Sequence, residues 1–318
     1  MYKRIKATRV YATLIKSWLS FAVVMTLLVG LWAGTGVAFY IYYPQDFGVF
    51  FFCSVAAIGI SAIGFIFNEP LVVMTTKAKR VKNREEAERM GVLDFYEDVH
   101  MLSKQAGLWK VPRIYVIPGL EVNACAFGWG LPGFSAVAAT EGIIRKLDRI
   151  QLQGVLSHEI AHIKNKDIII AVTLAALVIF FAFLAETLPR YLAFGGGSKS
   201  KSKSSKDALA ELIAIVVVIV TSIIIGKLLG PILQMFISRQ REYGADALGA
   251  KIMGSGKPLA DALAIISDSD MPTKVGKVKA SSSLFFLRAS AKSENNDNLF
   301  STHPSTDNRL KHLMKLEE

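Results

Sequence analysis

Four long apolar segments constrain the fold of this chain more than any other feature. Each runs for about 20 residues or more with few or no charges, which is the length that a helix needs to cross the hydrocarbon core of a bilayer. They raise the hydrophobic fraction to 52%, a high value for a soluble globular protein. The segments are residues 18–43, 47–67, 168–188 and 212–237. The sequence therefore predicts a multi-pass membrane protein with about four transmembrane helices.

The first apolar segment follows a basic N-terminus, residues 1–17, and superficially resembles a secretory signal. Its apolar run is longer than the hydrophobic region of a signal peptide, and a second run follows at once. We therefore expect a retained anchor, in which residues 18–67 form a hairpin of two spans.

Positive charges orient this hairpin. Lys and Arg crowd both of its outer flanks, whereas the connection Pro44-Gln45-Asp46 has no positive charge. The positive-inside rule then places both flanks in the cytoplasm, and we expect a plasma (inner) membrane protein. The net charge of +11 is explained by juxtamembrane basic residues that meet anionic lipid headgroups. The lipid bilayer is thus a predicted partner and nucleic acid is not.

The second hairpin, residues 168–237, leaves two topologies open. Its connection, residues 195–206, reads GGGSKSKSKSSK and is typical of a flexible linker. If both apolar segments span the membrane, this basic loop lies outside, against the positive-inside rule; in a shallow or re-entrant hairpin it stays inside. The length of both segments favours two full spans.

The remaining segments, residues 68–167 and 238–318, are enough for one soluble domain. Because they flank the second hairpin, an even number of crossings must separate them if they build one site. Cys53 lies in a predicted span and Cys125 in the soluble part, which indicates no disulfide framework and suits a reducing compartment.

Five residues, His158-Glu159-Ile160-Ala161-His162, contain the parts of a hydrolytic zinc centre. On a helix, residues four apart share one face, so both imidazoles can bind one ion. Glu159 lies one step round the helix, where it can act on a water molecule without being a ligand. A surface helix with solvated His and Glu residues is the alternative.

A catalytic zinc needs a third protein ligand and an open position for water. The short metzincin continuation is absent, because residues 164–167 lack the Gly and His that it requires. The strongest distant candidate is Glu242. If residues 238–247 are helical, Glu242 and Asp246 share a face, so that one carboxylate can bind the metal while the other holds an imidazole. A solvated charged helix beyond a membrane span fits this segment equally well.

The hydrophobic pattern supplies the elements around this motif. It predicts an amphipathic helix at residues 94–107 and a metal helix at residues 151–164. Short strands bounded by Gly or Pro are expected between them, at residues 113–117, 124–127 and 136–139. A sheet followed by the metal helix indicates an α+β zincin-like metalloprotease domain, mainly helical with a small sheet.

The chain resembles the HtpX-like membrane metalloproteases, relatives of the Ste24 prenyl-protein proteases, over nearly its whole length. Its four apolar segments, two before and two after the metal helix, match the family's arrangement. Cys125 replaces the usual Phe of one motif, and Ser305 stands where the family often has a second Pro; neither is a metal ligand. The motifs that carry the resemblance are residues 123–128, residues 158–162 with Asn165 and Asp167, residues 238–246, and Thr302-His303-Pro304 with Arg309.

The resemblance implies a cytoplasm-facing protease of membrane-protein quality control that cleaves polypeptide substrates. It implies one Zn²⁺ per chain, with His158, His162 and Glu242 as ligands. Asp246 is then expected to support a ligand, and Glu159 to act as the general base.

Three further residues receive expected roles from the same resemblance. His303 is suggested to stabilise the oxyanion, although a polar loop residue near a Pro turn explains it as well. Arg309 either bonds to the same region or pairs with a surface acid. Asn123, with Ala124 after it, is suggested to bind substrate as an added β-strand, or the strand is an ordinary edge strand.

Rival interpretations come from two classes, a different enzyme and a non-catalytic membrane protein that is either a transporter or a scaffold. An intramembrane site-2-type metalloprotease places the His-Glu-x-x-His motif inside a span, whereas here the motif precedes the span among polar residues. A transporter would expose ionisable residues along its spans, and here Lys227 is the obvious internal one. An inactive protease-like scaffold should have lost a ligand or the base, yet all are present.

Overall fold

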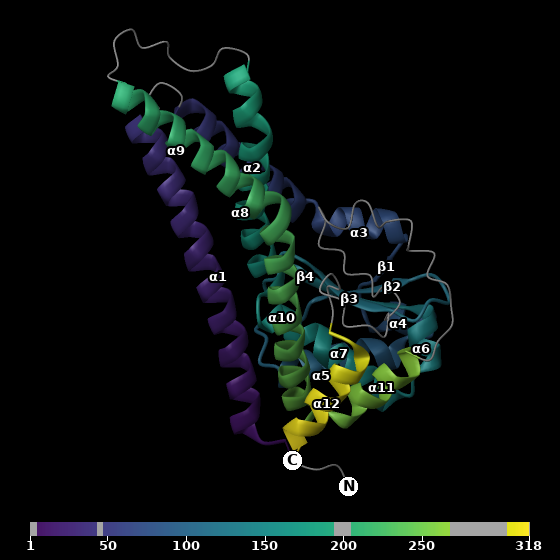
Figure 1. The fold of residues 1–318 in the computed structure, drawn as a ribbon. Helices are drawn as coiled ribbons and strands as arrows, with labels where there is room; N and C mark the ends of the chain where they lie inside the picture. Colours follow the sequence, from purple (N-terminus) through teal and green to yellow (C-terminus); the bar gives the residue numbers. More distant parts are fainter. Residues whose placement is uncertain (1–4, 43–46, 194–204, 268–303, 318) are drawn as a thin grey trace. The chain divides into compact units, whose positions relative to one another are not determined.

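The computed structural model describes residues 5–42, 47–193, 205–267 and 304–317 (Figure 1). His303 and residues 195–204 of the expected linker lie outside these ranges. The chain divides into two compact units. The α/β unit comprises Met1–Leu19, Gly64–Ala171 and Ile237–Glu318, and the helical unit comprises Ser20–Ile63 and Val172–Phe236.

The apolar segments form long helices, as predicted. The helices are α1 (Ala7–Tyr42), α2 (Phe47–Ile66), α8 (Asp167–Ala193) and α9 (Ser205–Ile223). Three described helices, α1, α2 and α8, are long and apolar enough to cross a membrane. A fourth candidate is a pair, Ile215–Leu229 and Ile232–Met253, that bends by 41°. The described residues thus hold three candidate spans, or four if the bent pair is one span.

The fourth apolar segment differs in detail from its prediction. Helix α9 begins at Ser205, inside the expected linker, and passes into a π-helix at Ile224–Leu229. Within the helical unit, a Cβ on Gly226 would lie 2.5 Å from the backbone nitrogen of Ala182. This close approach to α8 requires glycine, and it coincides with the π-helical turn that interrupts the regular helix.

The α/β unit contains one four-stranded sheet. Its strands are β1 (Lys79–Val81), β2 (Arg113–Ile117), β3 (Ala124–Gly128) and β4 (Ser135–Thr140), in the order β1-β2-β4-β3. Strands β2 and β4 are parallel, and the outer pairs are antiparallel. The three predicted strands are confirmed. Strand β1 was not predicted, because three residues that begin with Lys79-Arg80 show no alternating apolar pattern.

Helices α5 (Leu93–Gln105) and α7 (Arg149–Lys164) contribute to the main core and pack against each other. Helix α7 starts at a capping box in which Asp148 and Gln151 bond reciprocally. The apolar face of α7 is buried; its members are Leu152, Val155, Leu156, Ile160 and Ile163. Short helices complete this part of the unit: α3 (Asn68–Thr76), α4 (Arg84–Arg89) and α6 (Glu141–Lys146).

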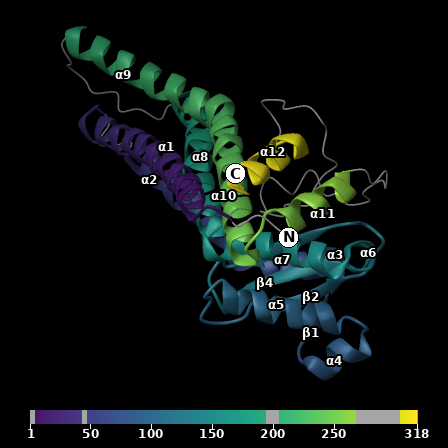
Figure 2. The same cartoon turned by 90° about the horizontal axis from the view of Figure 1, so that it is seen from below.

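Three helices from the C-terminal part of the chain complete the unit: α10 (Gly230–Met253), α11 (Lys257–Ser267) and α12 (Thr306–Glu317). Glycines let two of them approach α7 closely. A Cβ on Gly154 of α7 would lie 2.6 Å from the backbone nitrogen of Leu259 in α11. A Cβ on Gly249 of α10 would lie 3.0 Å from the backbone nitrogen of His158. Helix α10 is therefore held beside the motif helix, although it lies far away in the sequence (Figure 2).

Candidate metal centre

His158, His162 and Glu242 converge in the α/β unit. The two Nε2 atoms are 3.1 Å apart, His162 Nε2 lies 3.2 Å from Glu242 Oε1, and His158 Nε2 lies 3.7 Å from Glu242 Oε2. A tetrahedral ion with bonds of about 2.1 Å separates its ligand atoms by about 3.4 Å. Among the described residues, these three form the one group of His, Cys, Asp and Glu side chains placed to hold a metal. The donor set therefore fits a bound divalent ion.

Helical spacing produces this convergence from both sides. His158 and His162 are four residues apart on α7. Glu242, Asp246 and Gly249 follow the i, i+4, i+7 spacing of one face of α10. Because Gly249 lets the backbones approach at His158, the two carboxylates on that face are directed towards the imidazoles. The Glu242 carboxylate is almost fully buried, since its side chain is 1% exposed.

A carboxylate contacts the His158 ring, and a guanidinium in turn holds that carboxylate. The ring Nδ1 lies 2.9 Å from Asp246 Oδ1. Arg309 of α12 donates two hydrogen bonds to Asp246, of 2.5 and 2.9 Å. Burial alone would raise the pKa of Asp246, but Arg309 and His158 lower it to about 2. The Asp246 carboxylate is therefore charged and fixes the orientation of the His158 ring, with Nε2 directed at the site.

The support of His162 has the same chemistry. Its Nδ1 lies 2.5 Å from Asp167 Oδ2, and Arg241 pairs with Asp167 through its guanidinium. Burial alone would lower the pKa of His162, but its hydrogen bonds to Asp167 and Glu242 raise it to about 10. The two carboxylates therefore favour the protonated form of the His162 ring.

A tight turn brings Asp167 back to His162. Helix α7 ends at Lys164, and Lys166 adopts a left-handed conformation with a φ of 58°. Its N–H bonds to the Ile163 carbonyl at 3.1 Å, which closes the turn. Arg241 donates a 2.7 Å bond to the Asn165 carbonyl and thus holds both the turn and the carboxylate.

Arg241 also joins the site to the start of α1. Its guanidinium lies 4.6 Å from the ring centroid of Trp18 and donates a 3.4 Å bond to Ser17 Oγ. Both residues belong to the α/β unit. The Arg241 side chain is 5% exposed, so the charge beside His162 is shielded from solvent.

Glu159 lies on α7 beside strand β3. Burial and the nearby Glu159 carboxylate raise the pKa of the Cys125 thiol to about 12. Helix α7 contacts β3, which is an edge strand paired with β4 alone among the described strands. Asn123 directly precedes β3, and its backbone forms hydrogen bonds with Thr140. Ala124 is the first residue of β3 and pairs with Ala139 of β4. The expected base and the expected substrate strand are thus neighbours.

Comparison with known proteins identifies the class of this site. The family model of peptidase family M48 matches residues 93–317, which contain the three candidate ligands and the carboxylates and arginines that support them. The chain belongs to peptidase family M48. It is therefore a metalloprotease of a membrane-associated family, and its long apolar helices are consistent with that setting.

Several relatives of this M48 protein carry the same description, "Protease HtpX homolog". One from Aquifex aeolicus is 38% identical over 221 residues, covering 70% of each chain. Another from Pelotomaculum thermopropionicum is 31% identical over 299 residues, covering 94% of this chain and 97% of its own. The crystal structure of S. mikatae Ste24p shares the fold, with a TM-score of 0.52, 19% identity and coverage of 98% of this chain and 67% of that one.

The structure of this M48 chain brings most of the predicted site residues together. His158, His162, Glu242 and Asp246 meet, and Arg309 bonds to Asp246 in the buried site, not to a surface acid. Asn123 and Ala124 lie at the edge strand, and His303 lies outside the described residues.

Two residues of the site received no role from the sequence, Asp167 and Arg241. Asp167 follows His162 by five residues, and Arg241 precedes Glu242 directly. Their nearness in sequence to His162 and Glu242 was the available signal for a role in the site. Sequence spacing alone does not show that a turn at Lys166 reverses the chain between His162 and Asp167.

Proposed function

We propose that this protein is a membrane-bound, zinc-dependent endopeptidase that hydrolyses peptide bonds of misfolded or damaged membrane proteins in protein quality control, with its α/β unit facing the cytoplasm. One observation carries the catalytic part: His158, His162 and Glu242 converge in a buried cluster, and each imidazole is oriented by its own carboxylate. Two imidazoles and a carboxylate suit Zn²⁺ better than Mg²⁺ or Ca²⁺, which prefer all-oxygen sites.

His158, His162 and Glu242 would hold one ion per chain. When bound, zinc supplies Lewis-acid chemistry, which activates water and polarises a carbonyl oxygen. Glu159 Oε accepts the proton of the attacking water and then delivers it to the leaving amine nitrogen. Asp246 and Asp167 keep both Nδ1 atoms engaged, so that each ring presents Nε2 to the site.

Strand β3 is the proposed substrate platform. Apart from the Gly128 N–H, which bonds to the Asn68 side chain, its outer edge offers backbone N–H and C=O groups to an extended polypeptide, which would add as a further strand. Such backbone recognition is tolerant of sequence, as a protease of damaged proteins requires. Asn123 and Ala124 would contact the substrate beside Glu159, and His303 is proposed to stabilise the oxyanion.

Arg309 is proposed to act through Asp246. It donates two hydrogen bonds to the carboxylate that orients His158, and it also pairs with Glu242 at 3.5 Å. The proposed cytoplasmic orientation rests on the basic flanks of the first hairpin, and the name shared by the relatives supports a protease role.

The test is cleavage of an unfolded model protein by detergent-purified enzyme that has been stripped of metal and given back zinc. Wild type, Glu159→Gln and His158→Ala are compared, with bound metal quantified in each. We expect zinc-restored cleavage by the wild type alone, zinc without cleavage in Glu159→Gln, and neither in His158→Ala. Glu141→Gln, on the half-buried start of α6, is a matched carboxylate control and should cleave normally.

Cleavage retained by Glu159→Gln would refute the proposed base. Zinc bound by wild type and Glu159→Gln, with cleavage by neither, would favour the inactive scaffold instead.

A further inference from the structure

An apolar loop without charged residues joins strands β3 and β4. It runs from Trp129 to Phe134 and reads Trp-Gly-Leu-Pro-Gly-Phe. The ring of Trp129 stacks on Phe134, with centroids 5.3 Å apart and an interplanar angle of 11°. On its other side, Trp129 stacks on Phe65 at 5.9 Å. The loop is therefore an ordered aromatic stack, and Phe134 at its end is 48% exposed.

One side of the loop adjoins the points where the chain enters the apolar helices. Phe65 is the penultimate residue of α2. Gly130 has a positive φ of 64°, and a Cβ on it would lie 3.0 Å from Ile168 Cβ in the first turn of α8. Both contacts are within the α/β unit, which the chain enters from the helical unit at Ile63–Gly64 and leaves for it at Ala171–Val172. Since α2 and α8 are candidate spans, the loop lies next to the membrane ends of two of them.

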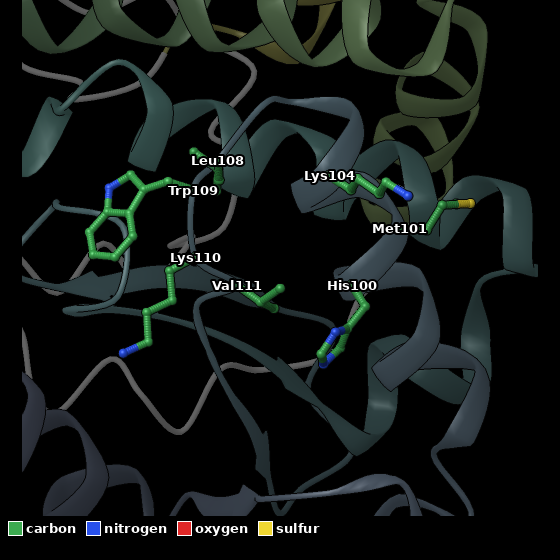
Figure 3. A pocket seen from close by; sticks show the side chains of 7 residues that line it. All are labelled: His100, Met101, Lys104, Leu108, Trp109, Lys110 and Val111. Atoms are coloured by element: carbon green, nitrogen blue, oxygen red, sulfur yellow. The ribbon is translucent and has the colours of Figure 1, made fainter.

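The other side of the loop reaches an exposed tryptophan. A Cβ on Gly133 would lie 2.8 Å from Lys110 Cδ and 3.3 Å from the Trp109 ring. Trp109 is 73% exposed, an unusual position for the largest side chain. It borders a surface hollow of about 460 Å³ whose lining also includes the apolar residues Leu108 and Val111. In Figure 3, the side chains of Trp109 and Lys110 extend away from the hollow on the side opposite Met101.

Tryptophan and lysine side by side match the chemistry of a bilayer interface. The indole is apolar but carries an N–H, so it favours the headgroup level over both water and hydrocarbon. A lysine ammonium beside it meets anionic headgroups while its stem covers apolar surface. A protein partner would have to reach the same surface beside the two span ends, where lipid headgroups are already present.

We propose that Trp109, Lys110 and the Trp129–Phe134 loop form a lipid-docking surface that rests in the headgroup region of the leaflet where α2 and α8 end. This surface is separate from the spans and from the metal centre. Its consequence is positional: Trp129 directly follows Gly128, the last residue of β3, so docking holds the open edge of β3 at the membrane surface. Polypeptide segments that emerge from the bilayer would then meet the edge strand without crossing bulk water.

The experiment uses the full chain in vesicles that contain anionic lipid. Tryptophan fluorescence is recorded in lipids brominated either near the headgroup or near the end of the acyl chain, for the wild type and for Trp109→Phe. The difference between the two proteins reports Trp109 alone, because the three other tryptophans contribute equally to both. We expect bromine near the headgroup to quench the Trp109 signal at least twofold and deep bromine to quench it less.

A control tryptophan is placed at Glu88, which is exposed on α4, in the Trp109→Phe background. Its signal should be unaffected by either lipid. A Trp109 signal that bromine at neither depth quenches would overturn the proposal. The measurement needs no catalysis, so it can be made in Glu159→Gln, and its outcome is independent of the proposed protease function.

Discussion

The two halves of the candidate metal centre use the same chemistry but assemble it differently. On one side, His162, Asp167 and Arg241 form a chain of imidazole, carboxylate and guanidinium. On the other side, His158, Asp246 and Arg309 do the same. We call these the His162 half and the His158 half; Glu242 contacts both.

The halves differ in how far apart their parts lie along the chain. His162 and Asp167 are five positions apart in the sequence and are joined by one turn. The partners of His158 are far more distant, because Asp246 and Arg309 follow it by 88 and 151 positions. In the His162 half, the imidazole and its carboxylate are thus placed by local backbone geometry, and Arg241 is the member that comes from a distant segment, α10. The His158 half forms only when α10 and α12 have packed on α7, so it couples the completed fold to the metal site.

The largest effect is expected from the residue that both halves share. Glu242→Ala removes the third ligand and leaves two imidazoles, which hold zinc weakly. We expect no zinc retained after gel filtration and no detectable cleavage, as measured by metal analysis and a peptidase assay. Asp261→Asn, in an exposed pair with Lys257, is the control and should match the wild type in both assays. Full zinc occupancy in Glu242→Ala would rule out this ligand.

The next comparison separates the halves directly. Asp246→Asn and Asp167→Asn should each weaken zinc binding by about 10- to 100-fold, because each frees one imidazole from its carboxylate. Asp246→Asn should also lower the free energy of unfolding by up to about 3 kcal/mol, since it removes the nearer of the two buried carboxylates that pair with Arg309 and leaves only Glu242 at 3.5 Å among the described residues. Asp167→Asn should lower the free energy of unfolding by less, because Arg241 keeps its hydrogen bond to the Asn165 carbonyl. Chelator competition and denaturant unfolding test both; equal destabilisation would remove the distinction between the halves.

The same distinction explains what the sequence predicts and what it does not. The local parts were predictable: the two imidazoles follow from helical spacing, and the strands and the buried face of α7 from hydrophobic periodicity. The pair Glu242 and Asp246 was found by its spacing, but its role followed from the family resemblance. Arg309 could not be assigned from the sequence, because its partner is set by the packing of α12 on the unit.

Protons provide a third comparison. In the metal-free fold the pKa of His162 is raised from 6.5 to about 10. The contribution of this proton to the free energy of unfolding is present in full below about pH 6.5 and is lost as the pH rises through about 10. Zinc must displace the proton, so zinc affinity should rise by about tenfold per pH unit as the pH increases towards about 10, and should level off above it. Chelator-buffered titrations at several pH values measure this slope, and Asp167→Asn should flatten it; a slope of zero in the wild type would contradict the account.

The smallest effect is expected from Arg241→Lys. Lysine retains the charge near Asp167 but cannot also reach the Asn165 carbonyl and stack on Trp18 as the planar guanidinium does. We expect zinc affinity to fall by a few fold, with a small change in unfolding free energy. Arg84→Lys, in an exposed pair with Glu97, is the control and should match the wild type. An effect as large as that of Asp167→Asn would mean that Arg241 does more than position the carboxylate.

The central claim is that the two halves and Glu242 hold one zinc ion, and X-ray absorption at the zinc edge tests it most directly. The sample is zinc-loaded Glu159→Gln, which should bind the metal without degrading itself. We predict one zinc per chain, with two imidazole nitrogens, oxygen for the remaining ligands and no sulfur. A zinc–sulfur contribution from Cys125, or a single imidazole in the ligand set, would contradict the account.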